Sequence, residues 1–292
     1  MLCSFANMIE EALRLANEHG LERVNERIEH SIIPAIHLSK AERHGPVGAS
    51  RLGGLPDLPP DHTWPARHGR PLGFISQIRC DELLEPDPEG LLPRTGMFYF
   101  FYDLEEQPWG FDPKDRGGAS VQYIPDAGTL IPANPPDGLD LDKCLLPPFH
   151  VVLTPFPSTP HIGSIAFEKL QLKEDECDRY FNLQSAIDER FTDDKNPRHQ
   201  LLGHACNIQG DMQLECQLVT NGLYCGDATG YQSPERKELE RGAAEWRLLL
   251  QIDSDDDLGV MWGDCGMIYF WIREAAMKAK QFDRAWTILQ CS

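Results

Sequence analysis

Residues 245–271 read EWRLLLQIDSDDDLGVMWGDCGMIYFW and contain two apolar runs joined by an acidic turn. The first run spans residues 248–252 and the second spans residues 267–271, and the turn between them is rich in Asp and Gly. Short apolar runs bounded by turn-forming residues are typical of buried strands. The stretch therefore predicts a β-hairpin at the centre of a sheet.

The same pattern occurs earlier in the chain. The run LGFISQI at residues 72–78 is followed, after a proline-rich acidic insert, by GMFYFF at residues 96–101. The two copies of this motif align Gln77-Ile78 with Gln251-Ile252 and Gly96-Met97 with Gly266-Met267. We therefore predict an α+β fold that is internally duplicated, with mostly antiparallel β-sheets and peripheral helices.

The segments around the two motifs predict the rest of the organisation. Residues 4–31 have the apolar spacing of two helices, with Gly20 as the stop between them. Residues 32–38 form a strand, which Pro34 would place at a sheet edge or at a strand start. We expect three parts that pack as one globular unit: N-terminal helices and an edge strand (1–44), a first β-rich repeat (45–160) and a second α+β repeat (161–292).

Residues that interrupt or cap secondary structure predict the remaining elements. Residues 45–71 and 125–148 are rich in Pro and Gly and predict ordered but irregular connections. Acidic residues at the start of 174–191 are typical of a helix N-terminus, and Ser233-Pro234 predicts a helix over residues 235–246. The pattern also predicts strands at 120–124, 150–156 and 286–289, and helical pieces at 210–221 and 274–280.

Charge and cysteine content limit the classes of function. The chain has 292 residues, with 46 acidic and 27 basic side chains and a formal net charge of −19. Such a charge disfavours nucleic acid and anionic membranes and favours solubility or a basic protein partner. The start of the chain lacks a signal-peptide pattern, and no apolar run is long enough to span a bilayer. With 9 cysteines and no C-x-x-C pair, we expect a cytoplasmic protein with free thiols.

Two clusters have residue types that bind metals. Asp253, Asp255 and Asp257 resemble the opening of a calcium loop, but the later positions hold Leu258 and Asp264, where such a loop needs Gly and Glu. A solvated hairpin turn is therefore the favoured interpretation. The second cluster comprises His199, His204, Cys206, Cys216 and Cys225. It lacks the close ligand pairs of a structural zinc site, so we predict buried thiols, no bound metal and no cofactor.

A ligand site follows from the predicted duplication. If two copies of the hairpin motif pack about a pseudo-dyad, their loops converge on a cleft, and clefts between repeats are favoured ligand sites. Arg116 is suited to clamping a carboxylate or phosphate, and Trp109 or Trp262 to stacking, although both tryptophans also suit the core. The predicted binding residues are Gln77, Trp109, Asp112, Arg116, Gln251, Trp262 and Asp264, with Gln209 and Asp211 in equivalent loops.

Four separated segments are similar to a known family. They are GGLPDLPP from Gly53, PWGFD from Pro108, LQIDSD from Leu250 and WGDCGMIYFW from Trp262. Over most of residues 45–292 the chain resembles the YwqG-like family of bacterial proteins of unknown function. The resemblance implies an α+β fold with an internal repeat and no established activity, cofactor or catalytic residue. Where that family carries a Gly-Tyr-Pro-Asp type segment in its second half, this chain has Gly203-His-Ala-Cys206.

The functional hypothesis combines these observations. The chain has no G-x-S-x-G motif or other signature of nucleophilic catalysis. We therefore expect a noncatalytic binding protein with an acidic surface, for example an immunity-like protein that binds a basic partner. The alternative is an enzyme that acts on a small polar molecule in the cleft between the repeats. In that case Asp264 or Asp112 would be the acid or base and Arg116 the anion clamp.

Overall fold

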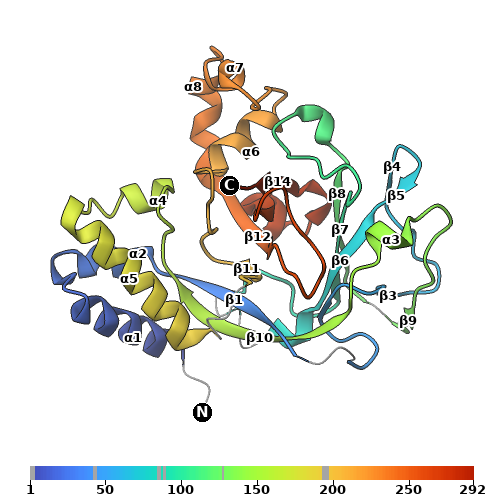
Figure 1. Cartoon of the computed structure of the whole chain (residues 1–292), viewed down its shortest axis with the longest axis horizontal. Coiled ribbons are helices and arrows are strands. Elements are labelled where there is room, and N and C mark those ends of the chain that lie inside the picture. The colour runs from blue at the N-terminus through green and yellow to red at the C-terminus, as the bar shows by residue number, and fades with distance from the viewer. Residues whose placement is uncertain (1–3, 42–44, 84–86, 88–89, 127, 193–196) are drawn as a thin grey trace.

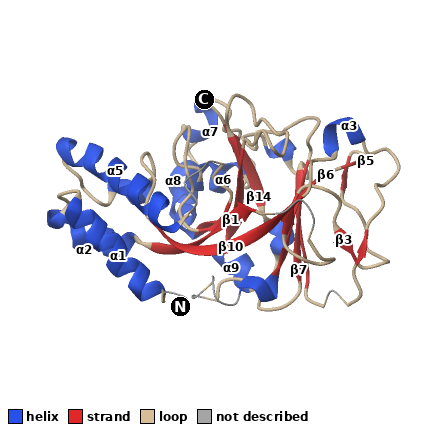
Figure 2. Ribbon diagram, turned by 60° about the horizontal axis from the view of Figure 1, so that its bottom comes forward, coloured by secondary structure: helices blue, strands red, loops and turns tan. Residues whose placement is uncertain are grey.

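The computed structural model describes residues 4–41, 45–83, 87, 90–126, 128–192 and 197–292 (Figure 1). Among these residues, ten strands form one sheet in the order β14-β13-β12-β11-β1-β10-β2-β6-β7-β8. Every neighbouring pair in this sheet is antiparallel, and the sheet is strongly curved (Figures 1 and 2). The α+β class with antiparallel strands is therefore confirmed.

Two long strands form the middle of the sheet. β1 (Ile33–Lys40) pairs with β10 (Phe149–Ser158) along its whole length. On its other side β1 pairs with β11 (Gln200–Leu202), so it is internal, and of the two predicted placements of Pro34 the strand start is right and the sheet edge is wrong. Pro34 is accommodated because it lies next to the start of β1, where β11 has not yet begun to pair.

The sheet continues on each side of this pair as an arm. The first arm consists of β2 (Arg51–Leu52), β6 (Gly73–Arg79), β7 (Met97–Tyr102) and β8 (Ala119–Ile124). The second arm consists of β11, β12 (Trp246–Asp253), β13 (Met267–Arg273) and β14 (Trp286–Gln290). Both predicted hairpins are thus present, as β6-β7 and β12-β13. Each has a register shift early in its first strand, between Phe74 and Ser76 and between Leu248 and Leu250.

The two arms pack against each other through aromatic side chains. The ring centres of Phe100 in β7 and Phe270 in β13 lie 5.3 Å apart, and those of Tyr102 and Trp262 lie 5.7 Å apart, both edge to face. Edge-to-face pairs are favoured because the positive edge of one ring meets the negative face of the other. Residues of both arms therefore share one hydrophobic core inside the curve of the sheet.

Four helices form a separate layer, here called the helical lobe, at the left of Figure 1. They are α1 (Phe5–Glu18), α2 (Asn25–Ser31), α4 (Ile165–Glu168) and α5 (Glu174–Phe191), with the short turn η1 (Glu22–Val24) between α1 and α2. Ser4 caps α1, and Gly20, at φ +68°, follows its end as predicted. The lobe has its own core, in which Leu15, Ile28 and Leu183 are buried.

A second group of helices, separate from the helical lobe, covers the outer face of the second arm. It contains α6 (Gln213–Val219), α7 (Ala228–Tyr231), α8 (Arg236–Leu239) and the 3-10 helix η4 (Glu240–Glu245). The helix predicted over residues 235–246 is therefore divided into two pieces. Gly242 lies in the second piece, where an added Cβ would be 2.5 Å from Gln217 Nε2, so this backbone packs closely on α6.

The remaining elements are short. They are β3 (Asp57–Leu58), β4 (Ala66–Arg67), β5 (Arg70–Pro71), η2 (Cys80–Leu83), η3 (Pro113–Asp115), β9 (Ile131–Pro132), α3 (Leu141–Cys144), α9 (Glu274–Lys278) and η5 (Phe282–Arg284). β3 pairs with β9, and β4 pairs with β5. Within the described ranges, no helix has the length and apolar character to cross a membrane.

Candidate ligand-binding cleft

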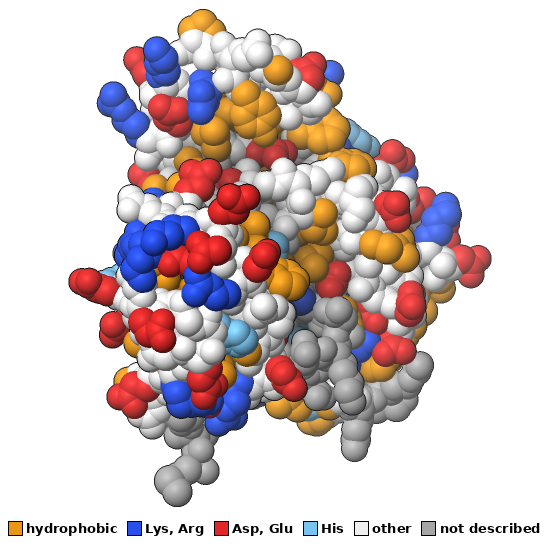
Figure 3. Space-filling view, turned by 60° about the vertical axis from the view of Figure 1, so that its left-hand side comes forward, with side chains coloured by type: hydrophobic (Ala, Val, Ile, Leu, Met, Phe, Trp, Pro, Cys, Tyr) orange, Lys and Arg blue, Asp and Glu red, His pale blue; other side chains and the backbone are white. Residues whose placement is uncertain are grey.

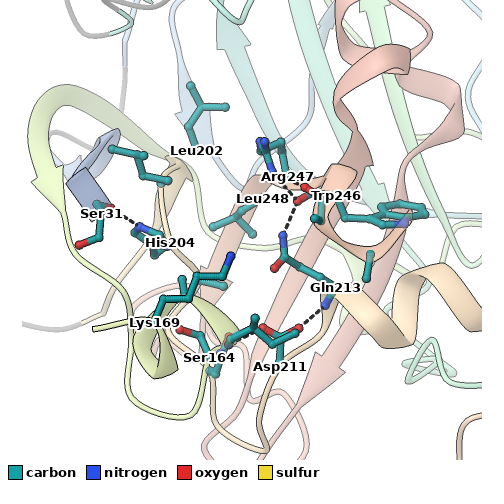
Figure 4. Close-up of a pocket in the computed structure, with 18 of the residues that line it drawn as sticks. Ser31, Ser164, Lys169, Leu202, His204, Asp211, Gln213, Trp246, Arg247 and Leu248 are labelled. Atoms are coloured by element: carbon teal, nitrogen blue, oxygen red, sulfur yellow. Dashed lines mark hydrogen bonds between the residues drawn. The ribbon is translucent and has the colours of Figure 1, made fainter. Parts of the chain in front are cut away.

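A large cavity lies between the helical lobe and the second arm, with a volume of about 1280 Å³. We call it the helix–sheet cleft (Figure 4). Its walls come from α2, from α4 and the residues after it, from the turn that follows β11, and from η4 and β12. Figure 3 turns this side of the molecule toward the viewer and shows acidic and basic side chains interspersed over the helices. The cleft is thus formed by segments far apart in the sequence.

The turn after β11 forms one wall of the cleft. Leu202 and Gly203 both have positive φ angles, of 57° and 74°. A Cβ on Gly203 would lie 2.4 Å from the Cβ of Ala35 in β1, so this position requires glycine. The turn directs His204 toward the helical lobe, where its Nε2 lies 2.8 Å from the Ser31 carbonyl oxygen (Figure 4).

The hydrogen bond to Ser31 defines which ring nitrogen of His204 carries the proton. A carbonyl oxygen only accepts, so Nε2 carries the proton and donates, which leaves Nδ1 unprotonated in the neutral ring. Burial lowers the pKa of His204 to about 4, and the bond to Ser31 opposes that effect only partly. His204 is therefore neutral at physiological pH and joins the second arm to the helical lobe.

Asp211 forms a second link across the cleft. One of its carboxylate oxygens accepts the N–H of Ile165 in α4 at 3.1 Å, and the other accepts the N–H of Gln213 at 3.0 Å. The Gln213 side chain donates in turn to the Trp246 carbonyl oxygen at 2.7 Å. These bonds position α4 against the start of α6 and β12, and they close one end of the cavity (Figure 4).

The predicted binding residues Gln77 and Gln251 are fully buried in the sheet. Gln77 accepts the N–H of Asp57 at 2.7 Å, and Gln251 accepts the N–H of Cys206 at 2.9 Å. Their amide nitrogens donate to the carbonyl oxygens of Ala49 and Arg198, respectively. Both side chains thus fix the turns that follow β2 and β11, and they do not line the helix–sheet cleft.

Trp109, Asp112 and Arg116 lie together in the loop after β7, which packs on β14. The Trp109 carbonyl accepts the N–H of Leu289 at 2.9 Å, and the Arg116 guanidinium lies 5.5 Å from the ring centre of Trp286. Asp112 caps η3. The Trp109 side chain is 36% exposed. The structure brings these three residues together but places them outside the helix–sheet cleft, and their role in binding stays a prediction.

The other predicted positions have different environments. Trp262 is fully buried and donates from its indole nitrogen to the Asp253 carbonyl at 3.1 Å, as a core residue would. Asp264 and Gln209 are exposed. Among the nine positions expected in converging loops, Asp211 alone lines the helix–sheet cleft. Polar cleft residues that the predicted site lacked include Lys169, His204 and Gln213.

The acidic turn after β12 surrounds a lysine. Lys40 Nζ lies 2.6 Å from Asp255 and 2.8 Å from Asp257, and the His199 imidazole donates to Asp255 at 3.1 Å. Although burial opposes it, the bonds from His199 and Lys40 hold the pKa of Asp255 far below its ordinary value. Asp253 accepts a backbone N–H, and burial raises its pKa. The ammonium group of Lys40 thus pairs with two of the three carboxylates that resembled a calcium loop.

The described residues contain no grouping of three or more His, Cys, Asp or Glu side chains that could hold a metal ion. The predicted His and Cys cluster is divided among different parts of the structure, and only Cys216 and Cys225 share the same surroundings. His199 contacts Asp255 and His204 contacts Ser31, while Cys216 and Cys225 are buried under the helices of the second arm. Burial raises the pKa of Cys225 to about 12, so this thiol is a poor nucleophile.

The fold and the cleft define an α+β protein with one curved antiparallel sheet and a cavity beneath a helical lobe. The family model described as a domain of unknown function, DUF1963, matches residues 50–291, and the chain belongs to that family. A search of curated proteins found no match. The matched region begins after α1, α2 and β1, so the α2 wall of the cleft lies outside it.

Proposed function

We propose that this chain is a binding protein whose ligand is a small molecule held in the helix–sheet cleft. The cavity carries this proposal: at about 1280 Å³ it is somewhat larger than the roughly 300–1,000 Å³ of typical ligand pockets, and like them it combines apolar walls with a few polar groups. Leu202 and Leu248 supply apolar surface, and Lys169 and Gln213 supply polar groups (Figure 4).

The hydrogen bonds that the polar side chains of the cleft make within the protein favour binding over catalysis. Ser164 lines the cleft and is of a residue type that can act as a nucleophile, but its hydroxyl accepts the N–H of Phe167 at 3.0 Å and caps α4. His204 donates its Nε2 proton to Ser31, and Asp211 accepts two backbone N–H groups. A nucleophile needs a base within hydrogen-bond reach. None of these three side chains bonds to another of them in the described structure.

Native mass spectrometry of protein purified from its own cell extract tests the proposal. We expect an excess mass of a few hundred daltons that denaturation releases. Ala244 is exposed and lines the cleft, so Ala244→Trp should fill the cavity and abolish the excess mass. Ala275→Trp is the matched control because Ala275 is exposed on α9 and does not line the cleft. A bare mass for the wild type, or an equal excess in both variants, would overturn the proposal.

A second candidate rests on the net charge of −19. An acidic surface steers association with a basic protein, and an immunity-like role in the cytoplasm is one such function. A pull-down from extract at low salt should then recover a basic protein that high salt releases. Recovery of the chain alone at low salt would count against this candidate, and it would leave the cleft proposal unaffected.

The proposal includes the predicted duplication and the YwqG-like relationship. Three matched pairs of residues support the duplication. Tyr99 pairs with Gln77 in the first arm and Tyr269 pairs with Gln251 in the second, and their hydroxyls donate to the carbonyls of Asp57 and Cys206, both at 2.6 Å. In this correspondence His204 stands where the first copy has Leu55. That substitution provides the link between the second arm and the helical lobe, and it borders the cleft.

A further inference from the structure

Most charged side chains in the helix–sheet cleft have partners within the protein. Their hydrogen bonds and ion pairs join Arg27 to Gln171 (3.0 Å), Arg247 to Glu274 (2.8 Å), Glu240 to Arg236 (3.4 Å), and Asp211 to the N–H groups of Ile165 and Gln213. In the part of the chain that the structure describes, the side chains of Lys169 and Glu26 have neither an ion pair nor a hydrogen bond. A charge left without a partner beside a cavity is available to a ligand.

The two unpaired charges lie on different elements. Glu26 and Lys169 are both exposed and both line the cleft, and Glu26 lies on α2. Lys169 follows α4, and Figure 4 shows its side chain extending into the cavity between His204 and Gln213. The bond from Ile165 to Asp211 anchors the short α4 just before Lys169, so the ammonium group starts from a fixed backbone. The interior of the cleft therefore presents a positive charge.

Apolar side chains line the cavity beyond Lys169. Leu202 and Leu248, each only 2% exposed, lie beyond it in the cavity (Figure 4). Ala205 and Trp271 add to this wall and are each 5% exposed. Covering such a wall with an apolar group stabilises a complex in proportion to the apolar area removed from water. The surface next to the charge therefore favours a ligand with an apolar body.

Trp271 adds a second hydrogen-bond donor. Its indole nitrogen is buried and has no hydrogen-bond partner among the described residues, although indole N–H groups usually find one. An indole N–H can only donate, as can an ammonium group. Both Lys169 and Trp271 are thus complementary to acceptor atoms on a ligand.

We infer that the ligand is a small organic carboxylate with an apolar body, whose carboxylate pairs with Lys169 and whose body lies on Leu202 and Leu248. This inference rests on the proposed function and names its ligand class. A phosphate is less suitable, because phosphate sites use forked Arg contacts or several backbone N–H groups. The guanidinium groups of Arg27 and Arg247 are already bonded to other side chains.

The net charge of −19 repels an anion at long range, but it does not decide binding at contact. Salt screens exposed charges beyond about 10 Å at 0.1 M. The ion pair with Lys169 forms at hydrogen-bond distance in a partly enclosed cavity, where screening is weaker. The local charge therefore outweighs the distant ones.

Titration calorimetry of the full chain with octanoate tests the inference. Acetate and 1-octanol are the companion probes, since acetate lacks the apolar body and 1-octanol lacks the charge. We expect octanoate to bind at least about tenfold more tightly than either. Lys169→Met should weaken octanoate about tenfold or more and leave 1-octanol unchanged. Lys237→Met, an exposed substitution on α8 outside the cleft, is the matched control and should change neither.

The outcomes separate this inference from the proposed function. If octanoate binds the wild type and Lys169→Met equally while Ala244→Trp blocks it, the cleft binds ligands but the role of Lys169 is overturned. If octanoate does not bind the wild type, or inorganic phosphate competes with it better than acetate does, the carboxylate class is overturned. Lys169 is exposed, so Lys169→Met should fold. Lys169→Gln, checked by thermal melting, gives a second variant for the same comparison.

Discussion

Gln77 and Gln251 make the same pair of hydrogen bonds in opposite arms of the sheet. Each side-chain oxygen accepts the N–H of a residue in the next turn, Asp57 or Cys206, and each side-chain nitrogen donates to a carbonyl oxygen just before the neighbouring short strand. Gln77 has one further partner, the Asp57 carboxylate, at 3.0 Å. The two amides therefore hold equivalent turns, but only the turn held by Gln251 borders the helix–sheet cleft.

Gln251→Ala should lower the free energy of unfolding by about 2–4 kcal/mol, because a buried N–H and a buried C=O lose their partners. Gln77→Ala should cost more, since it also removes a donor from the buried Asp57 carboxylate. Urea unfolding measures both. Gln281→Ala, at an exposed position, should change stability by less than about 0.5 kcal/mol. Equal effects of Gln251→Ala and Gln281→Ala would contradict the structural role of the buried amide.

Much of the fold could be predicted because its main strands carry strong local signals. The apolar runs at 72–78 and 248–252 became β6 and β12, and the helix expected at 174–191 became α5 (Glu174–Phe191). By contrast, β2 and β11 have two and three residues, which is too short for any periodic pattern. Their place in the sheet depends on pairing with distant strands, which a single sequence does not reveal.

The cleft was harder to predict than the sheet. It forms where the helical lobe meets the second arm, and this contact depends on tertiary packing between distant segments. Asp211 was expected in a converging loop, but Lys169 follows a helix of only four residues, which has no periodic signal. The one clue in the sequence is His204, which lies in the segment Gly203-His-Ala-Cys206 where this chain departs from the family that it resembles. Its residue type suggests a metal ligand and gives no indication of a contact with α2.

His204 should make stability depend on pH in the acidic range. Burial lowers its pKa in the folded state to about 4, below its ordinary value of 6.5. Protonation therefore favours the unfolded chain, and stability falls as pH falls from 6.5 towards 4, by about 3 kcal/mol. His204→Gln keeps a donor for the Ser31 carbonyl but does not titrate, so it should flatten this part of the profile.

Urea unfolding at several pH values tests the role of His204. His30→Gln is the control because His30 is exposed, and it should leave the slope between about pH 4 and 6.5 unchanged. An unchanged slope in His204→Gln would show that the loss of stability on acidification arises elsewhere.

Glu215 should make stability depend on pH in the direction opposite to His204. It lies in α6, and burial raises its pKa to about 7 from 4.5, although a hydrogen bond from Tyr231 opposes the shift. The folded state therefore retains the proton to higher pH, so stability falls as pH rises from about 4.5 to 7, by about 3 kcal/mol. Glu215→Gln should be more stable than the wild type at about pH 8 and equal to it at about pH 4. Thermal melting at the two pH values is the measurement, with the exposed Glu238→Gln expected to show no such difference.

Lys40 should be essential for burying Asp255. The carboxylate of Asp255 is 5% exposed, and Lys40 and His199 are its side-chain donors in the described structure. Lys40→Met removes the ammonium partner of a buried carboxylate and leaves it the bonds from His199 and from the backbone N–H of Asp257, so it should cost about 3–5 kcal/mol at neutral pH. Because the pKa of Asp255 in the fold lies below 3.8, the stabilisation is present above that value and is lost as pH falls below it. The cost of Lys40→Met should therefore shrink in acid.

A double-mutant cycle isolates this pair. Asp255→Asn removes the charge that Lys40 neutralises, so adding Lys40→Met to Asp255→Asn should cost much less than Lys40→Met alone. The difference between the two costs is the coupling free energy, and urea unfolding of the wild type and the three variants gives it. Additive costs would mean that Lys40 stabilises this turn through packing on Phe149, whose ring centre lies 5.2 Å from its ammonium group, and not through the charge of Asp255.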